Sequence, residues 1–166
     1  GTISLGYLEK VLCLLLREGV PIRDMETILE TLGDHAGALK DIDIVTEYVR
    51  QALKRTITRR FAEANSLRVI TVDPKVEDTI VASVKKSEAG SYLAMDPDLI
   101  QKIVNITSGE IDKVKDVIPN IIILTSPIVR IYFKKLIDQF IPNITVLSYS
   151  EIDNTAQIQA IGNIAM

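Results

Sequence analysis

Cysteine and histidine, which can act as a nucleophile and a base, occur once each in this chain, as Cys13 and His35. Any nucleophile activated by a histidine would therefore have to use His35. Cys13 stands inside a leucine-rich run, and we expect it to be a packed core residue. His35 follows Gly33 at the end of a predicted helix, where the helix dipole favours a histidine. One thiol and one imidazole do not complete a zinc site, so we predict no catalytic residue, no metal site and no enzyme.

A candidate anion site follows the predicted strand 121–124. Thr125 and Ser126 supply two hydroxyl groups immediately before a predicted helix, and Arg130 comes one turn later. Free N–H groups at a helix N-terminus can hold an anion together with such side chains. The simpler interpretation is that Ser126 caps the helix and Pro127 is its first residue. The sequence has no Gly-x-Gly-x-x-Gly motif and no Gly-Lys-Ser/Thr phosphate loop, so we predict no cofactor.

A basic stretch suggests a second alternative, a helical nucleic-acid-binding module. Its members are Arg50, Lys54, Arg55, Arg59 and Arg60. At about 100° per residue these side chains flank an apolar stripe and do not form one face. The chain has a net charge of −3, whereas nucleic-acid binders carry a clear basic excess. We therefore favour a solvated helix face, or contacts to another domain, and predict no nucleic-acid partner.

Four charged residues gather around the turn at Gly19 and are candidates for an interface: Arg17, Arg23, Asp24 and Glu26. Our hypothesis is that this polar corner meets a neighbouring subunit or domain, where paired charges set orientation more than affinity. The alternative is a solvated turn.

The first third of the chain has the pattern of amphipathic helices. A first helix is predicted after Ser4, a good N-cap residue, with a buried leucine face. That face is Leu5, Leu8, Leu12, Leu15 and Leu16. A second helix is predicted at about 22–35 and a third at about 43–62. Short connections between such helices indicate a small helical subdomain.

After Asn65 the pattern changes to strands alternating with helices. Apolar runs at 69–72, 121–124 and 144–147 predict buried strands, and Asp73-Pro74 and Asp96-Pro97 predict two helix starts. Such alternation is typical of a parallel sheet with crossover helices. The predicted fold is therefore mixed α and β: a helical subdomain at 1–64, then a small α/β domain with a mostly parallel sheet at 65–166. We expect the apolar tail 158–166 to be surface for a partner.

The composition is that of a globular protein, with 47% hydrophobic and 25% charged residues. No apolar run approaches the roughly 20 residues that cross a bilayer, and a single cysteine fits a reducing compartment. The chain begins Gly-Thr and not Met, so we expect a piece of a longer protein.

Several stretches, in order along the whole chain, resemble one family. The longest is Leu15-Leu-Arg-Glu-Gly-Val-Pro-Ile-Arg-Asp-Met-Glu-Thr-Ile-Leu-Glu-Thr-Leu-Gly-Asp-His-Ala36; the others are Glu47–Thr58, Thr125–Arg130 and Val146–Ile152. They are similar to the FlhA/InvA/MxiA family of type III secretion export-gate proteins, and closest to its flagellar branch.

The resemblance implies the cytoplasmic portion of a bacterial inner-membrane protein that takes part in flagellar protein export. In that family four cytoplasmic domains form a ring, usually of nine subunits, that receives export substrates and their chaperones. This chain would hold the third and fourth domains. Its partners would be other copies of the subunit and other export-apparatus proteins, with chaperone–substrate complexes contacted mainly through domains that it lacks. No catalytic residue or cofactor is implied. An anion- or small-molecule-binding α/β module and a helical nucleic-acid binder remain the alternatives.

Overall fold

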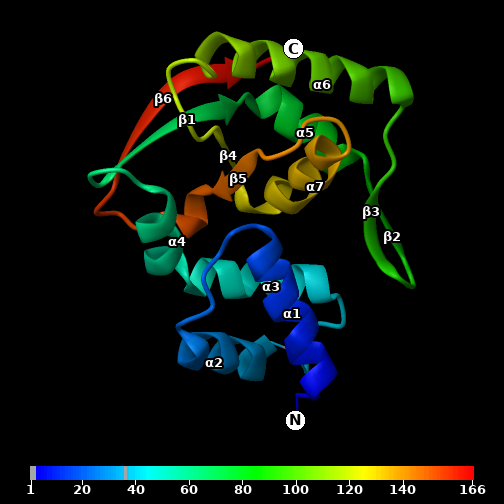
Figure 1. Ribbon diagram of the computed structural model, residues 1–166. Helices are drawn as coiled ribbons and strands as arrows, with labels where there is room; N and C mark the ends of the chain where they lie inside the picture. Colours follow the sequence, from blue (N-terminus) through cyan, green and yellow to red (C-terminus); the bar gives the residue numbers. More distant parts are fainter. Residues whose placement is uncertain (1–2, 36) are drawn as a thin grey trace. The chain divides into compact units, whose positions relative to one another are not determined.

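The structure of the chain, a computed structural model, describes residues 3–35 and 37–166. Gly1, Thr2 and Ala36, which ends the longest family-like stretch, lie outside them. The chain divides into two compact units (Figure 1): Gly1–Asn65 with Ser150–Ala156, and Ser66–Tyr149 with Gln157–Met166. We call them the helical unit and the α/β unit. The predicted mixed fold class is confirmed. The structure adds that segment 150–156, which follows most of the α/β unit in sequence, belongs to the helical unit.

The helical unit contains four helices: α1 (Leu5–Arg17), α2 (Met25–His35), α3 (Ile42–Ala52) and α4 (Lys54–Phe61). Ser4 caps α1 as predicted, because its Oγ accepts the N–H of Tyr7 at 3.1 Å. The prediction of a single helix at 43–62 is wrong, because the helix is interrupted at Leu53 (φ −91°, ψ 21°), between α3 and α4. Leucine is a good helix former, so no local signal predicts this break.

The buried face of α1 is centred on Val11 and Leu15, which are fully buried. Leu5 is 81% exposed and Leu16 is 53% exposed, so the predicted leucine face is wrong at both ends. The prediction that Cys13 packs in the core is also wrong, because its side chain is exposed. At 100° per residue, Cys13 lies about 200° from both Val11 and Leu15, on the opposite side of the helix.

The α/β unit is built on a four-stranded parallel sheet with strand order β5-β4-β1-β6. Its elements are β1 (Ser66–Val72), α5 (Pro74–Ala82), β2 (Val84–Ser87), β3 (Gly90–Leu93), α6 (Pro97–Val114), β4 (Ile122–Thr125), α7 (Pro127–Asp138), β5 (Thr145–Ser148) and β6 (Gln157–Ile164). A 3-10 turn, η1 (Tyr149–Glu151), follows β5 and leads into segment 150–156 of the helical unit. The parallel sheet and both Asp-Pro helix starts are confirmed. Asp73 and Asp96 cap α5 and α6 by accepting the N–H two residues on, at 3.2 and 2.9 Å.

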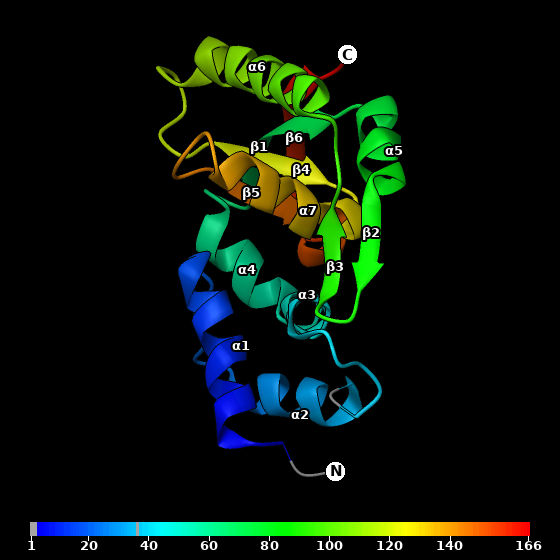
Figure 2. The ribbon, with the colours of Figure 1, turned by 90° about the vertical axis from the view of Figure 1, so that its right-hand side faces the viewer.

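Two elements of the α/β unit were not predicted. The first is the antiparallel hairpin β2–β3, which Figure 2 shows as a ribbon apart from the four-stranded sheet. The second is β6, which pairs with β1 from Ser66–Gln157 to Val72–Ile164. The tail 158–166, which we expected to be surface for a partner, is therefore largely an edge strand of the sheet, in which Ile158 is 44% exposed.

The core of the α/β unit joins one face of the sheet to its helices. Ile70, Ile123 and Val146 are neighbours across β1, β4 and β5, and they pack with Ile80 of α5 and Phe133 of α7. All five are at most 1% exposed. This aliphatic cluster holds the strand ends in place, since the core is close-packed.

The free edge of β5 is closed by α7. Lys134 Nζ donates to the carbonyl of Ile144 at 2.8 Å, and Arg130 Nη1 donates to that of Val146 at 2.9 Å. On β6, the N–H of Asn163 donates to Glu110 Oε1 at 3.1 Å. Side chains that bond an edge in this way prevent pairing with another chain. Within the described ranges, no helix is long and apolar enough to cross a membrane.

Candidate functional site

The four residues of the predicted polar corner are all exposed, but the structure divides them between two helices. Arg17 ends α1, whereas Arg23, Asp24 and Glu26 lie at the start of α2. Asp24 caps α2: its Oδ1 accepts the N–H of Thr27 at 3.2 Å and its Oδ2 accepts the Thr27 hydroxyl at 2.7 Å. These two bonds lower the pKa of Asp24, with the hydroxyl making the larger contribution. Asp24 therefore has a local structural role.

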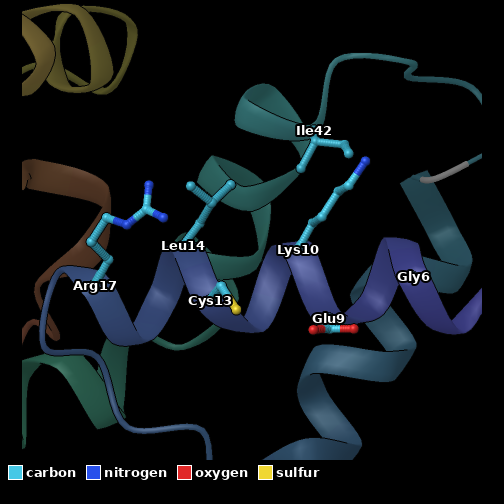
Figure 3. Close-up of a pocket in the computed structure, with 7 residues that line it drawn as sticks. All are labelled: Gly6, Glu9, Lys10, Cys13, Leu14, Arg17 and Ile42. Atoms are coloured by element: carbon cyan, nitrogen blue, oxygen red, sulfur yellow. The ribbon is translucent and has the colours of Figure 1, made fainter.

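Arg17 belongs to a groove of about 420 Å³ that runs along α1 and that we call the α1 groove. It is lined by Gly6, Glu9, Lys10, Cys13, Leu14, Arg17 and Ile42. Figure 3 shows Lys10, Leu14 and Arg17 projecting from the same side of α1, with Lys10 reaching toward Ile42, the first residue of α3, while Glu9 and Cys13 lie on another side of the helix. Gly6 leaves one end open, since a Cβ there would meet nothing within 4 Å.

The α1 groove combines separated cations with an apolar side chain. Lys10 and Arg17 lie two helical turns apart, about 10 Å along the axis, with the apolar side chain of Leu14 between them. Cys13 is not paired with the chain's imidazole, because the His35 ring stacks on Tyr48 with centroids 4.5 Å apart. Among the residues described, no cluster of three or more metal-ligating side chains is present.

A second exposed surface, which the sequence analysis did not identify, lies on α2. Its members are Glu26, Leu29, Glu30 and Asp34, all exposed, and we call it the α2 stripe. Three acids at a spacing of four residues share one face of a helix, and Leu29, 44% exposed, lies between them. The spacing of the acids is visible in the sequence and could have predicted this face.

Arg50 corrects the interpretation of the basic stretch as a solvated face. Its side chain is buried, and its Nε and Nη2 donate to the two carboxylate oxygens of Glu151 at 2.9 and 2.8 Å. Glu151 is also 1% exposed, and Glu18 lies 3.8 Å from Nη1. This bidentate pair fastens segment 150–156 to α3, so Arg50 is not available to a nucleic acid. The other basic residues of the stretch are exposed, as predicted: Lys54, Arg55, Arg59 and Arg60.

The groups of the predicted anion site already have partners within the α/β unit. The N–H of Ser126 donates to Glu77 Oε2 at 2.7 Å, and the Thr125 hydroxyl donates to the carbonyl of Ser126. Arg130 is fully buried and bonds the carbonyl of Val146. Ser126 lies at the N-cap position of α7 and Pro127 begins the helix, as the simpler interpretation predicts, but the Ser126 side chain makes no capping hydrogen bond. An external anion site stays a prediction, and it now requires that the carboxylate of Glu77 move aside.

Comparison with known sequences gives consistent matches. The sequence profile of the FHIPEP family matches residues 1–157. The flagellar biosynthesis protein FlhA of Bacillus subtilis is 40% identical over 161 residues, which are 96% of this chain and 24% of that protein. The invasion protein InvA of Salmonella typhimurium is 31% identical over 157 residues, 95% of this chain and 23% of that protein. The chain thus spans about a quarter of the length of these relatives.

Solved structures agree over nearly the whole chain. Chlamydia pneumoniae CdsV superposes with a TM-score of 0.89 at 36% identity, covering 98% of this chain and 47% of that one. Nonameric SctV-C from EPEC has a TM-score of 0.86 at 30% identity, covering 98% and 49%. CdsV in its complex with CdsO has a TM-score of 0.85 at 35% identity, covering 98% and 48%. The chain therefore belongs to the FHIPEP family, and the resemblance to FlhA and InvA that its sequence predicted is confirmed.

Proposed function

We propose that this chain is a non-enzymatic cytoplasmic part of a flagellar type III export gate, with a role in ring assembly and in the export of flagellar substrates. The observation that carries the proposal is the match to nonameric SctV-C over 98% of this chain. The 40% identity to B. subtilis FlhA, against 31% to InvA, favours the flagellar branch.

Within that role we assign residues 1–64 to the third cytoplasmic domain of the family and residues 65–166 to the fourth. The polar corner of Arg17, Arg23, Asp24 and Glu26 is the proposed contact to a neighbouring subunit or domain. The proposed partners of this chain are other copies of the subunit. The structure of CdsV with CdsO supports further contacts to proteins of the export apparatus. Chaperone–substrate complexes bind mainly to domains outside this chain.

The alternative functions have weaker support. In the anion-binding alternative, the carboxylate of Glu77 occupies the N–H that a ligand would need. In the nucleic-acid alternative, Arg50 would have to bind a phosphate, but its side chain is buried in the ion pair with Glu151. The flagellar role accounts for the full length of the chain, whereas each alternative uses only one short stretch.

A segment exchange tests the proposed function. The matching segment of B. subtilis FlhA is replaced by this chain, and flagellin secretion and swimming are measured in cells that lack their own FlhA. We expect the chimera to restore secretion to a substantial fraction of the wild-type level. The matched control carries Arg50→Glu, which places a carboxylate against Glu151 and should abolish secretion by unfolding the helical unit.

Two results would contradict the proposal. A chimera that accumulates to normal levels without secreting any flagellin would exclude a flagellar role. If the same exchange in InvA restores virulence-type secretion while the FlhA chimera does not, the chain belongs to the other branch of the family.

A further inference from the structure

The α1 groove and the α2 stripe of the helical unit are complementary to each other. The groove has the order cation, apolar, cation in Lys10, Leu14 and Arg17. The stripe has the order acid, apolar, acid in Glu26, Leu29 and Asp34, with Glu30 beside the leucine. The end charges are seven and eight residues apart, about 10 and 12 Å along a helix. The charged ends can therefore pair while the two leucines meet in the middle.

The two surfaces do not satisfy each other within one chain. Over residues 3–35 and 37–166, no ion pair joins Lys10 or Arg17 to an acid of α2. Both helices instead pack on α3, with Val11 and Ile28 buried. The charged residues of the groove and the stripe are exposed, and Leu14 is half-buried. Glu9 is the one acid among the groove residues, and Figure 3 shows it on another side of α1 from Lys10 and Arg17, so the side that carries these two residues is cationic.

We infer that the α1 groove of one copy of this chain binds the α2 stripe of the next copy. The inference rests on the proposed ring function and names the contact that would build it. Each chain carries one groove and one stripe, so the contact is head-to-tail and repeats from copy to copy. Head-to-tail contacts close into rings when the rotation permits, which agrees with nonameric relatives such as SctV-C. Of the polar-corner residues, Arg17 then belongs to the groove and Glu26 to the stripe, whereas Asp24 caps α2.

The chain's single cysteine provides a direct test, because Cys13 lies in the wall of the groove. A disulfide forms only when the two Cα atoms approach within about 7 Å. One chain keeps Cys13, and a size-tagged second chain carries Cys13→Ser and Leu29→Cys. We expect mild oxidation of the mixture to give a disulfide-linked heterodimer. Its yield should be at least about tenfold higher than the yield of linked dimer from either chain oxidised by itself.

The matched control places the second thiol outside the stripe at the same exposure. Val81 of α5 is 44% exposed, as is Leu29, so the control chain carries Cys13→Ser and Val81→Cys. It should give only the background of random collisions. Equal cross-linking of the Leu29→Cys and Val81→Cys chains would overturn the inference.

Charge reversal tests the contact without a covalent trap. Lys10→Glu with Arg17→Glu makes the two ends of the groove acidic, and Glu26→Lys with Asp34→Lys makes the two ends of the stripe basic. Each double variant opposes like charges, so its self-association by sedimentation should weaken about tenfold or more. The chain with all four changes has complementary surfaces again and should recover, as should an equimolar mixture of the two double variants.

The control for charge alone is Lys75→Glu with Lys102→Glu, two exposed lysines of the α/β unit, which should leave association unchanged. The inference would be overturned if the chain with all four charge reversals folds normally and stays dissociated. It would also be overturned if the wild-type chain remains monomeric at its highest soluble concentration. These outcomes are separable from the chimera: secretion without the Cys13 cross-link refutes only this contact, whereas the cross-link without secretion refutes only the proposed function.

Discussion

The two units each bury one arginine completely, and they use it differently. In the helical unit, Arg50 meets a buried carboxylate, and the pair ties α3 to the segment around Glu151. In the α/β unit, Arg130 meets the carbonyl of Val146 and, with Lys134, covers the edge strand β5. The first arginine joins parts of the chain that are 101 residues apart, whereas the second closes a surface against other chains.

This difference extends to the surfaces of the two units. In the α/β unit, side chains bond the carbonyls of Ile144 and Val146 on one edge strand and the N–H of Asn163 on the other. The helical unit leaves charged helical faces exposed, with cations at Lys10 and Arg17 and acids on α2. Side chains that bond a sheet edge hinder unwanted pairing there, whereas exposed faces of complementary charge are suited to assembly. We therefore expect mutations in the two units to act on different properties.

The largest effect is expected from Glu151→Ala. It leaves the charge of Arg50 buried without its bidentate partner, and breaking a buried pair in this way costs about 3–5 kcal/mol of unfolding free energy. Urea unfolding measures the loss, and hydrogen exchange should locate it in α3 and segment 150–156. The paired change Arg50→Met with Glu151→Leu removes both charges and should cost clearly less. A loss below about 1 kcal/mol for Glu151→Ala would show that the pair does not hold the segment.

A smaller effect is expected from Lys134→Met, which keeps the apolar stem and removes the ammonium group. The carbonyl of Ile144 then loses its donor, which costs about 1–2 kcal/mol. Because the edge of β5 is also opened, aggregation during storage should accelerate, as measured by light scattering. Lys135→Met, at an exposed neighbouring position, is the control and should not aggregate faster. Equal aggregation of both variants would mean that the lysine does not protect the edge.

Cys13→Ala should change the unfolding free energy by less than about 0.5 kcal/mol, as is usual for exposed positions. Alkylation of the native thiol should be as fast as that of a small peptide thiol, which a reaction time course would show. A loss of 2 kcal/mol or more would place Cys13 in the core after all.

The smallest effect concerns pH and the cap of α2. Because the Thr27 bonds lower the folded-state pKa of Asp24, its stabilisation is complete above the unfolded-state pKa. It is lost as the pH falls through the lower, folded-state pKa. Asp24→Asn keeps a capping side chain but does not titrate, so the difference in urea midpoint between the two proteins should change in this acidic range. A difference that is constant with pH would exclude the role of the carboxylate.

Much of the fold was predictable because its signals are local. The caps of Ser4, Asp73 and Asp96 bond N–H groups two or three residues away, so spacing along the chain suffices to place them. The strand β6 was missed because its alternation is interrupted: the pairing with β1 shifts register between Val69 and Ile70. A bulge of this kind removes the period-two pattern that predicts a strand.

The sequence by itself determined the capped starts of α1, α5 and α6, the order of helical and α/β parts, and the family. Tertiary structure alone decided which charges are partners. Arg50 reaches Glu151 across 101 residues, and Ser126 reaches Glu77 across 49. It also decided that the core side of α1 lies at Val11 and Leu15, which leaves Cys13 and the groove exposed. The physical reason is range: a cap or a helix face depends on neighbours within one or two turns, whereas a buried ion pair exists only after the chain has folded back on itself.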